Sequence, residues 1–138
     1  MTDDCRFCQI VAGERPAYVL FEDERTLAFL DRNPAVTGHT IVIPREHEEG
    51  VLTIDDSTSA AVFETVRRVA SALDATLEPE GFSVFHTTGP LVGTIEHAHV
   101  HLVPRFADDE VSLSLPRNTL ESEEADALTA RVREQLSG

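Results

Sequence analysis

Lysine is absent from this chain of 138 residues, so all 11 of its cationic side chains are arginines, set against 25 aspartates and glutamates. The formal net charge is −14 at pH 7. A carboxylate-rich surface stays hydrated in concentrated salt, where a Debye length of about 3 Å at 1 M mutes its self-repulsion. We therefore predict adaptation to a very salty cytosol. The alternative is an acidic protein from a cytosol of moderate salt concentration. The charge argues against non-specific binding to nucleic acid, but not against small anionic ligands held at a local site.

Long apolar runs are missing as well, and no stretch of the sequence is long enough to span a bilayer. Residues 1–4 begin no signal peptide, so we expect a soluble, cytoplasmic protein without a membrane partner. Internal repeats, low-complexity segments and interdomain linkers are also lacking. A chain of this length with 41% hydrophobic content can bury one core. This predicts a single domain over residues 1–138.

The chain has only two cysteines, Cys5 and Cys8, in a Cys-x-x-Cys arrangement. Two cysteines this close in a cytosolic chain argue against a structural disulfide. A redox pair is expected after a strand in a thioredoxin-like unit, which the start of this chain does not provide. A closed tetrahedral zinc site needs two more ligands, for which His47 and an outer member of a later histidine triplet are candidates. Unligated thiols are the alternative.

The triplet, His97, His99 and His101, holds half of the six histidines within five residues. A period of two places all three on one face of a β-strand and the intervening apolar residues on the core face. The outer pair is then about 13 Å apart at the backbone, too far for one metal ion to take all three comfortably. His99, flanked by an imidazole on each side, suits a reacting atom. A surface cluster or an incidental metal site is the alternative.

Hydrophobic periodicity predicts an α+β fold, with a mainly antiparallel sheet of about five strands and one long and one or two shorter helices packed on one face. Asp55 or Asp56 begins the long helix and Pro79 stops it. The other expected elements are a short helix over 7–11, strands over 18–22, 26–31, 38–43, 82–86 and 95–103, and a terminal amphipathic helix over about 121–137.

The alternating pattern over 97–103 resembles the signature of the histidine triad (HIT) family of nucleotide hydrolases and transferases, in which apolar residues separate and follow three histidines. Five further segments look like the N-terminal half of the family, in order, so the resemblance covers about residues 5–105. These segments are Cys5 to Cys8, Gly13 to Pro16, Phe21 to Asp23, Leu27 to Asp31 and Gly38 to Arg45.

The resemblance implies that His99 attacks the α-phosphorus of a nucleotide and forms a nucleotidyl-histidine, from which water releases a nucleoside monophosphate such as AMP. Attack needs a neutral imidazole whose other nitrogen donates to a backbone carbonyl. His101 and His39 match family positions that contact the phosphate, where a donated proton or a positive charge would oppose the developing charge. The alternative for both is ordinary surface exposure.

By similarity, a purine nucleotide or its conjugate is the ligand: Asp31 accepts hydrogen bonds from the ribose, and Phe7 and Phe29 line the base slot unless they are core aromatics. Arg32 replaces an aliphatic residue of many relatives, which predicts an altered base preference or an added ligand contact. His86 stands where relatives have asparagine near the ligand. The loop before the triad is one residue short and lacks a glutamine, so Gly93 and Thr94 are left to contact the phosphate.

For zinc, Cys5, Cys8, His47 and His97 match the ligand positions of the metal-containing members, which makes His97 structural. A homodimer with joined sheets is also implied. His101 is retained where the branch that transfers nucleotides to sugar phosphates has glutamine, and this favours hydrolysis of a nucleoside phosphoramidate or dinucleoside polyphosphate. The alternatives are a zinc hydrolase that uses triad histidines as ligands to activate water, and a nucleotide-binding regulatory module without turnover.

Overall fold

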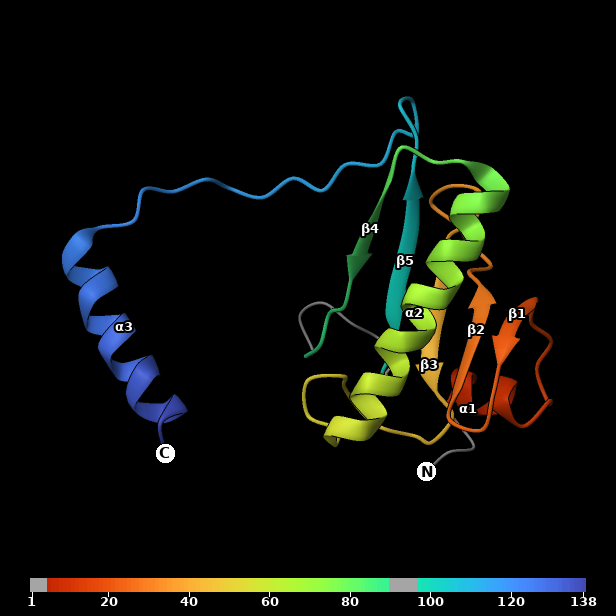
Figure 1. Ribbon diagram of the computed structural model, residues 1–138, viewed down its shortest axis with the longest axis horizontal. Coiled ribbons are helices and arrows are strands. Elements are labelled where there is room, and N and C mark those ends of the chain that lie inside the picture. The colour runs from red at the N-terminus through yellow and green to blue at the C-terminus, as the bar shows by residue number, and fades with distance from the viewer. Residues whose placement is uncertain (1–4, 90–96) are drawn as a thin grey trace.

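The computed structural model describes residues 5–89 and 97–138, which form the predicted five-stranded antiparallel sheet with one long helix (Figure 1). The strands lie in the order β1-β2-β3-β5-β4. No helix in the described part of the chain has the length and apolar content needed to cross a membrane. In chain order the elements are α1 (Arg6–Val11), β1 (Val19–Glu22), β2 (Thr26–Leu30), β3 (Thr40–Pro44), α2 (Asp56–Leu77), β4 (Gly81–Phe85), β5 (Val100–Arg105) and α3 (Ser122–Leu136).

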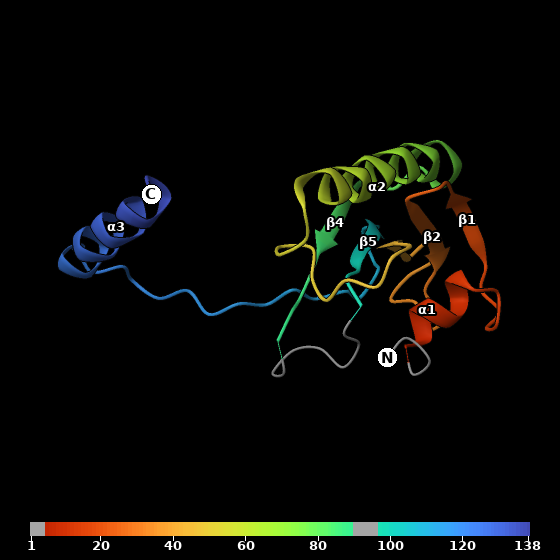
Figure 2. The ribbon, with the colours of Figure 1, turned by 90° about the horizontal axis from the view of Figure 1, so that it is seen from below.

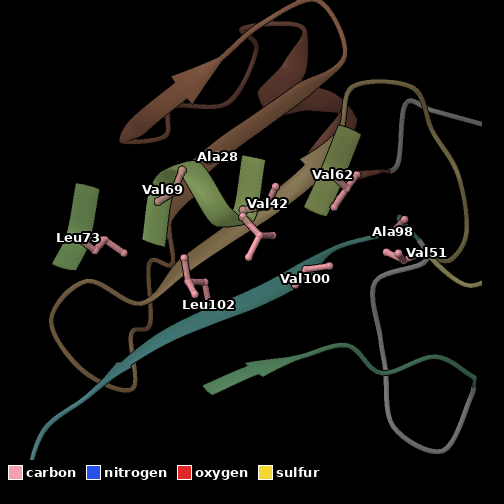
Figure 3. Packing of buried hydrophobic residues seen from close by; sticks show 10 residues of the cluster. Ala28, Val42, Val51, Val62, Val69, Leu73, Ala98, Val100 and Leu102 are labelled. Carbon is pink, nitrogen blue, oxygen red and sulfur yellow. The ribbon is translucent and has the colours of Figure 1, made fainter. Parts of the chain in front are cut away.

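The long helix α2 covers one face of the sheet and begins where the sequence predicts. The side chain of Asp55 accepts a hydrogen bond from the backbone N–H of Thr58 (2.7 Å), which satisfies a free donor of the first turn. The helix ends at Leu77, and its C-cap residue Glu78 adopts a left-handed conformation directly before Pro79. Figure 3 shows the core beneath α2, where helix residues meet strand residues; its buried members are Ala28, Val42, Val51, Val62, Val66, Val69, Leu73, Ala98, Val100 and Leu102.

The short helix α1 packs on the opposite face, so the expectation that all helices share one face is wrong (Figure 2). Phe7 is its buried residue, and it packs in a second core cluster with Leu27, Phe29, Ile41 and Ile43. β2 and β3 are central strands with apolar residues on both faces. Strands with two apolar faces need a covering helix on each side of the sheet. The prediction of one covered face came from the alternation of apolar and polar residues in the other strands.

β5 is shorter than predicted: it begins at Val100, so His97 and His99 precede the strand. The reason is that the backbone here bonds outside the ladder, since the Ala98 N–H donates to the carbonyl of Glu48. The alternation of side chains nevertheless holds. Ala98, Val100 and Leu102 are buried in the core under α2, while the ring of His99 lies on the other side, against Phe7 of α1.

The C-terminal helix α3 forms as predicted but does not pack on the sheet. None of its residues is buried, and Figure 1 shows it well apart from the rest of the molecule, on the side of β4. An extended segment joins it to the end of β5. The folded body is therefore built from residues up to about Asp109, and only α1 and α2 cover the sheet.

The turn that leads into β3 requires glycine at position 38. Gly38 has φ of +93°, and a Cβ there would lie 2.7 Å from Leu77 Cδ1 and 3.0 Å from Pro104 Cγ. We expect Gly38→Ala to lower the free energy of unfolding by about 1–3 kcal/mol, through backbone strain and overpacking. Gly81→Ala is the matched control, because no atom lies within 4 Å of its added Cβ. Urea unfolding of both variants checks this; equal stability would contradict it.

Candidate active site

A pocket of about 500 Å³ opens between α1 and the sheet, beside His99 and His101. Six residues that the sequence analysis assigned to catalysis or nucleotide binding line it: Phe7, Phe29, Asp31, Arg32, His99 and His101. The lining also contains residues to which that analysis gave no role: Arg6, Ile10, Arg15, Pro16, Ala17, Asn33, Ile41 and Thr87.

The imidazole of His99 is held in one orientation by its backbone surroundings. Its Nδ1 lies 2.7 Å from the carbonyl oxygen of His97 and must donate to it, because a carbonyl only accepts. Nδ1 of His86 in turn donates to the carbonyl of His99 (2.9 Å). Burial lowers the pKa of His99, so the ring is neutral at pH 7. A neutral ring protonated at Nδ1 carries its free lone pair at Nε2.

His39 and His101 form a chain whose tautomers follow from one backbone group. The N–H of Ala35 donates to Nδ1 of His39 (2.9 Å), so a neutral His39 carries its proton on Nε2. That Nε2 lies 2.9 Å from Nδ1 of His101, which therefore accepts. The remaining proton of neutral His101 is thus on Nε2. His101 lines the pocket, so this N–H is a donor that a ligand there can use.

His39 itself does not line the pocket and is 6% exposed. Both of its ring nitrogens already have partners within the protein. Burial lowers its pKa, against the opposing effect of Asp31. Its influence on a ligand must therefore pass through His101.

The environment of His101 also keeps that ring neutral. Burial, then the neighbouring His99 and His39, lower its pKa to about 4. Phe85 stacks on the ring, with 4.7 Å between centroids and 14° between planes. The stack with Phe85 fixes the orientation of the ring, and the lowered pKa keeps the ring uncharged at pH 7. His101 is therefore an oriented, neutral hydrogen-bond donor.

The nucleoside-binding residues predicted on β2 and α1 lie together in the pocket. Phe7 and Phe29 meet edge to face, with centroids 5.5 Å apart, and both belong to the second core cluster as well as to the pocket wall. Asp31 follows β2; its Oδ1 accepts from the N–H of Asn33 (2.9 Å) and its Oδ2 lies 3.4 Å from His39 Nε2. The carboxylate is a pocket acceptor next to an apolar wall.

Three arginines line this pocket, although the chain as a whole is strongly acidic. Only Arg32 was assigned to the ligand from the sequence. Arg15 is oriented by a hydrogen bond from its Nε to Oε1 of Gln9 (3.0 Å), and Arg6 is on α1 between the two cysteines. The local excess of positive charge suits an anionic ligand. Both missed arginines lie inside segments that carry the family resemblance, which was the available signal.

Three further predicted ligand contacts have different outcomes. His86 is not among the described residues that line the pocket, and its Nδ1 donates to the carbonyl of His99, so its contact with a ligand stays a prediction. Gly93 and Thr94 lie outside the described residues.

Cys5, Cys8, His47 and His97 come together at the N-terminal end of α1, with one ligand atom from each lying within 4.8 Å of all the others. Nδ1 of His97 is 3.3 Å from Sγ of Cys5 and 3.5 Å from Sγ of Cys8, and Nδ1 of His47 is 3.2 Å from Sγ of Cys8. Zinc bonds of about 2.3 Å to sulfur and 2.0 Å to nitrogen, at tetrahedral angles, put these atoms about 3.5 Å apart. The four residues fit a closed zinc site.

The tautomer of His97 supports this fit. Its Nε2 donates to the carbonyl of Pro44 (2.9 Å), which leaves the lone pair of Nδ1 for a metal. A second group, Asp31, His39 and His101, also has ligand atoms within 4.8 Å of one another. Here the tautomer is unfavourable, because the Ala35 N–H puts the proton of His39 on the nitrogen that would have to bind.

Comparison with known protein sequences places these residues in a family. The model described as the HIT domain matches residues 12–108. An uncharacterized HIT-like protein of Borreliella burgdorferi is 38% identical over 77% of this chain and 78% of its own. The adenylylsulfatase HINT3 of Arabidopsis thaliana is 34% identical, over 99% of this chain and 71% of its own. The adenosine 5′-monophosphoramidase hnt1 of Schizosaccharomyces pombe is 31% identical, over 96% of this chain and 98% of its own.

Solved structures agree with this. The crystal structure of SMU.412c from Streptococcus mutans has a TM-score of 0.92 and 35% identity, covering 99% of this chain and 87% of that one. A zinc-bound histidine triad family protein from Mycobacterium smegmatis has a TM-score of 0.74 and 32% identity, covering 99% of both chains. With a family model over most of the folded body and relatives of this identity along the chain, the protein belongs to the histidine triad (HIT) family.

Proposed function

We propose that this protein is a hydrolase that cleaves nucleotide conjugates, such as nucleoside phosphoramidates or dinucleoside polyphosphates, at the α-phosphate. The observation that carries the proposal is the bond from His99 Nδ1 to the His97 carbonyl, which leaves a free lone pair on Nε2 of a residue that lines the pocket. Two similar proteins named above, a phosphoramidase and an adenylylsulfatase, support an adenylyl conjugate as the substrate class.

In the first step the lone pair on His99 Nε2 attacks the α-phosphorus, and the bond from phosphorus to the leaving nitrogen or oxygen breaks. The leaving group keeps that electron pair and takes a proton from solvent. In the second step water attacks the same phosphorus, loses a proton to solvent, and the bond from Nε2 to phosphorus breaks to release the nucleoside monophosphate. Neutral His101 donates a hydrogen bond to a phosphate oxygen in both steps.

The rest of the pocket binds the nucleoside. Phe7 and Phe29 provide an apolar slot for the purine, and the carboxylate of Asp31 accepts from the ribose hydroxyls. Arg32, together with Arg6 and Arg15, contributes positive charge that favours a phosphate-bearing ligand over a neutral nucleoside. Gly93 and Thr94 are proposed to contact the phosphate, and His86 is proposed to contact the ligand. All three proposals rest on the sequence and its resemblance to the family.

Cys5, Cys8, His47 and His97 are the proposed zinc ligands. When bound, zinc would supply a structural cross-link between α1, the loop after β3 and the histidine segment. This cross-link would act on catalysis through His97, because the carbonyl of the same residue holds Nδ1 of His99.

A zinc hydrolase built on Asp31, His39 and His101 is the second candidate, favoured by the proximity of their ligand atoms. It requires the proton of His39 to leave Nε2, against the bond from Ala35. A regulatory module that binds nucleotide without turnover is the third.

The high-salt cytoplasm and the single domain over residues 1–138 remain proposals from the sequence. The homodimer remains a proposal from the family resemblance.

The test is to trap the intermediate. The protein is mixed with an adenosine phosphoramidate in concentrated salt, quenched within the turnover time, digested and analysed by mass spectrometry. An adenylyl group on the peptide that contains His99 is the expected result. Turnover with no labelled peptide, abolished by a chelator while the fold stays intact, would instead support the zinc hydrolase. Binding without turnover on a panel of conjugates would support the regulatory module.

The neutral state of His101 predicts a pH dependence of stability. The pKa of His101 is lowered from 6.5 to about 4 in the folded chain, so between these values the unfolded chain binds a proton that the folded chain does not. The free energy of unfolding therefore falls as the pH drops through this window, by up to roughly 3 kcal/mol from this residue. Urea unfolding from pH 7 to 4 should show a shallower dependence for His101→Gln than for wild type. Parallel curves would contradict the assignment.

A further inference from the structure

His99, the nucleophile of the proposed function, lies just before the start of β5. Among the described residues, the last pairs of β5 with its two neighbours are Val100 with Val42 of β3 and His101 with Phe85 of β4. His99 precedes both pairs, so the ladder of backbone hydrogen bonds that fixes β5 stops before it. Its backbone depends on another support if its ring is to keep one position.

The side chain of His86 supplies that support. His86 is the first residue after β4, and its Nδ1 donates to the carbonyl oxygen of His99 (2.9 Å). The register of β4 with β5 would next place residue 86 opposite residue 100. The imidazole thus bonds the peptide group directly before that position, where the ladder has already ended.

Two hydrogen bonds therefore hold His99, one at its ring and one at its backbone. The ring Nδ1 donates to the carbonyl of His97 (2.7 Å), and the carbonyl of His99 accepts from His86. The ring of His97 is fixed in the same way, since its Nε2 donates to the carbonyl of Pro44 on β3 (2.9 Å). With the ring bond alone, the backbone of His99 could still shift and carry its Nε2 with it.

The other ring nitrogen of His86 faces the protein. This Nε2 is buried and has no hydrogen-bond partner among the described residues. A Cβ at Gly50 would lie 3.9 Å from it, so the loop after β3 covers this edge of the ring. A buried nitrogen without a partner costs free energy, so its presence calls for an explanation. The bond from Nδ1 to the backbone of His99 is the one that the structure offers.

We propose that His86 is a positioning residue for the reaction, which acts through the backbone of His99 to aim Nε2 of that residue at the α-phosphorus. This inference rests on the proposed function, in which that nitrogen attacks. An error of about 1 Å in the placement of a reacting group can lower the rate about 100-fold. Ligand contact, the role that the family resemblance implies for His86, would have to use its Nε2, because Nδ1 is already bonded to His99.

Two amide variants separate these roles. The amide nitrogen of asparagine lies as many bonds from Cβ as histidine Nδ1, and that of glutamine as many as Nε2. His86→Asn should therefore keep the bond to the His99 carbonyl, whereas His86→Gln should lose it. We expect the single-turnover rate of His99 adenylylation by an adenosine phosphoramidate to fall about 10- to 100-fold in His86→Gln and to stay within about threefold of wild type in His86→Asn. The dissociation constant of AMP should change by less than about threefold in both.

Nitrogen-15 NMR of the His99 ring gives a readout that needs no turnover. Wild type and His86→Asn should each show one set of ring signals, with the proton on Nδ1. In His86→Gln these signals should broaden or split, because the residue samples more than one position. Circular dichroism shows whether each variant folds, and His86→Leu, which also lacks the donor, takes the place of His86→Gln if that variant does not.

Equal adenylylation rates in the asparagine and glutamine variants would overturn the proposal, as would equal His99 signals. A slow His86→Asn with weakened AMP binding, beside a fast His86→Gln, would overturn it in favour of ligand contact through Nε2. If wild type forms no adenylyl-histidine, the proposed hydrolase mechanism fails. The NMR comparison still decides in that case whether His86 holds His99, so the two failures are distinguishable.

Discussion

His99→Ala is expected to lower kcat by a factor of about 10⁴ or more on a nucleoside phosphoramidate, because it removes the atom that attacks phosphorus. The ring it deletes is bonded to the His97 carbonyl and packs against Phe7 and His101. Binding of the product nucleotide should change much less, since Asp31 and the aromatic slot stay in place. Single-turnover kinetics and calorimetric titration with AMP measure the two effects separately.

His101→Gln is the informative comparison for this variant. It removes a hydrogen-bond donor while leaving the nucleophile, so a loss of about 10²- to 10³-fold is expected, and the adenylyl group should still appear on His99. If His99→Ala kept turnover within about tenfold of wild type, covalent catalysis at this residue would be wrong.

Cys8→Ser is expected to remove bound zinc and to lower the free energy of unfolding by about 3 kcal/mol or more, because metal binding to a closed site contributes directly to folding. Cys8 Sγ lies 3.2 Å from His47 Nδ1 and 3.5 Å from His97 Nδ1, so the substitution removes a ligand that neighbours both histidines. Metal analysis should find about one zinc per chain in wild type and a strongly reduced content in the variant.

A chelator provides the internal control. Wild type should melt at a lower temperature after chelation, whereas Cys8→Ser should be nearly insensitive. Activity should fall in parallel, since the carbonyl of His97 orients His99. A wild-type melting temperature unchanged by a chelator that removes all metal would sink the structural role. Two zinc ions per chain would instead point to a second metal at Asp31, His39 and His101.

Local patterns predicted much of the fold correctly. The period of two at 98, 100 and 102 gives three residues that are almost fully buried, and the spacing of apolar residues after Asp55 gives a helix that ends before Pro79. These succeed because periodicity and caps depend on neighbours a few residues away. The same local rules missed that α1 covers the second face, since no short segment records which side of a sheet it will pack against.

By itself, the sequence determined the α+β architecture, Cys5 and Cys8 as candidate metal ligands, and the face on which the imidazoles lie. Only the tertiary structure decided which nitrogen of each histidine carries its proton, because that choice depends on the carbonyls of His97 and Pro44 and on the Ala35 N–H. The tertiary structure also showed that His39 lies outside the pocket lining while His101 belongs to it, that Arg6 and Arg15 line the pocket, and that α3 has no buried residue. Cys5 and His97 are 92 positions apart along the chain, and contacts over such separations arise only when the whole sheet closes.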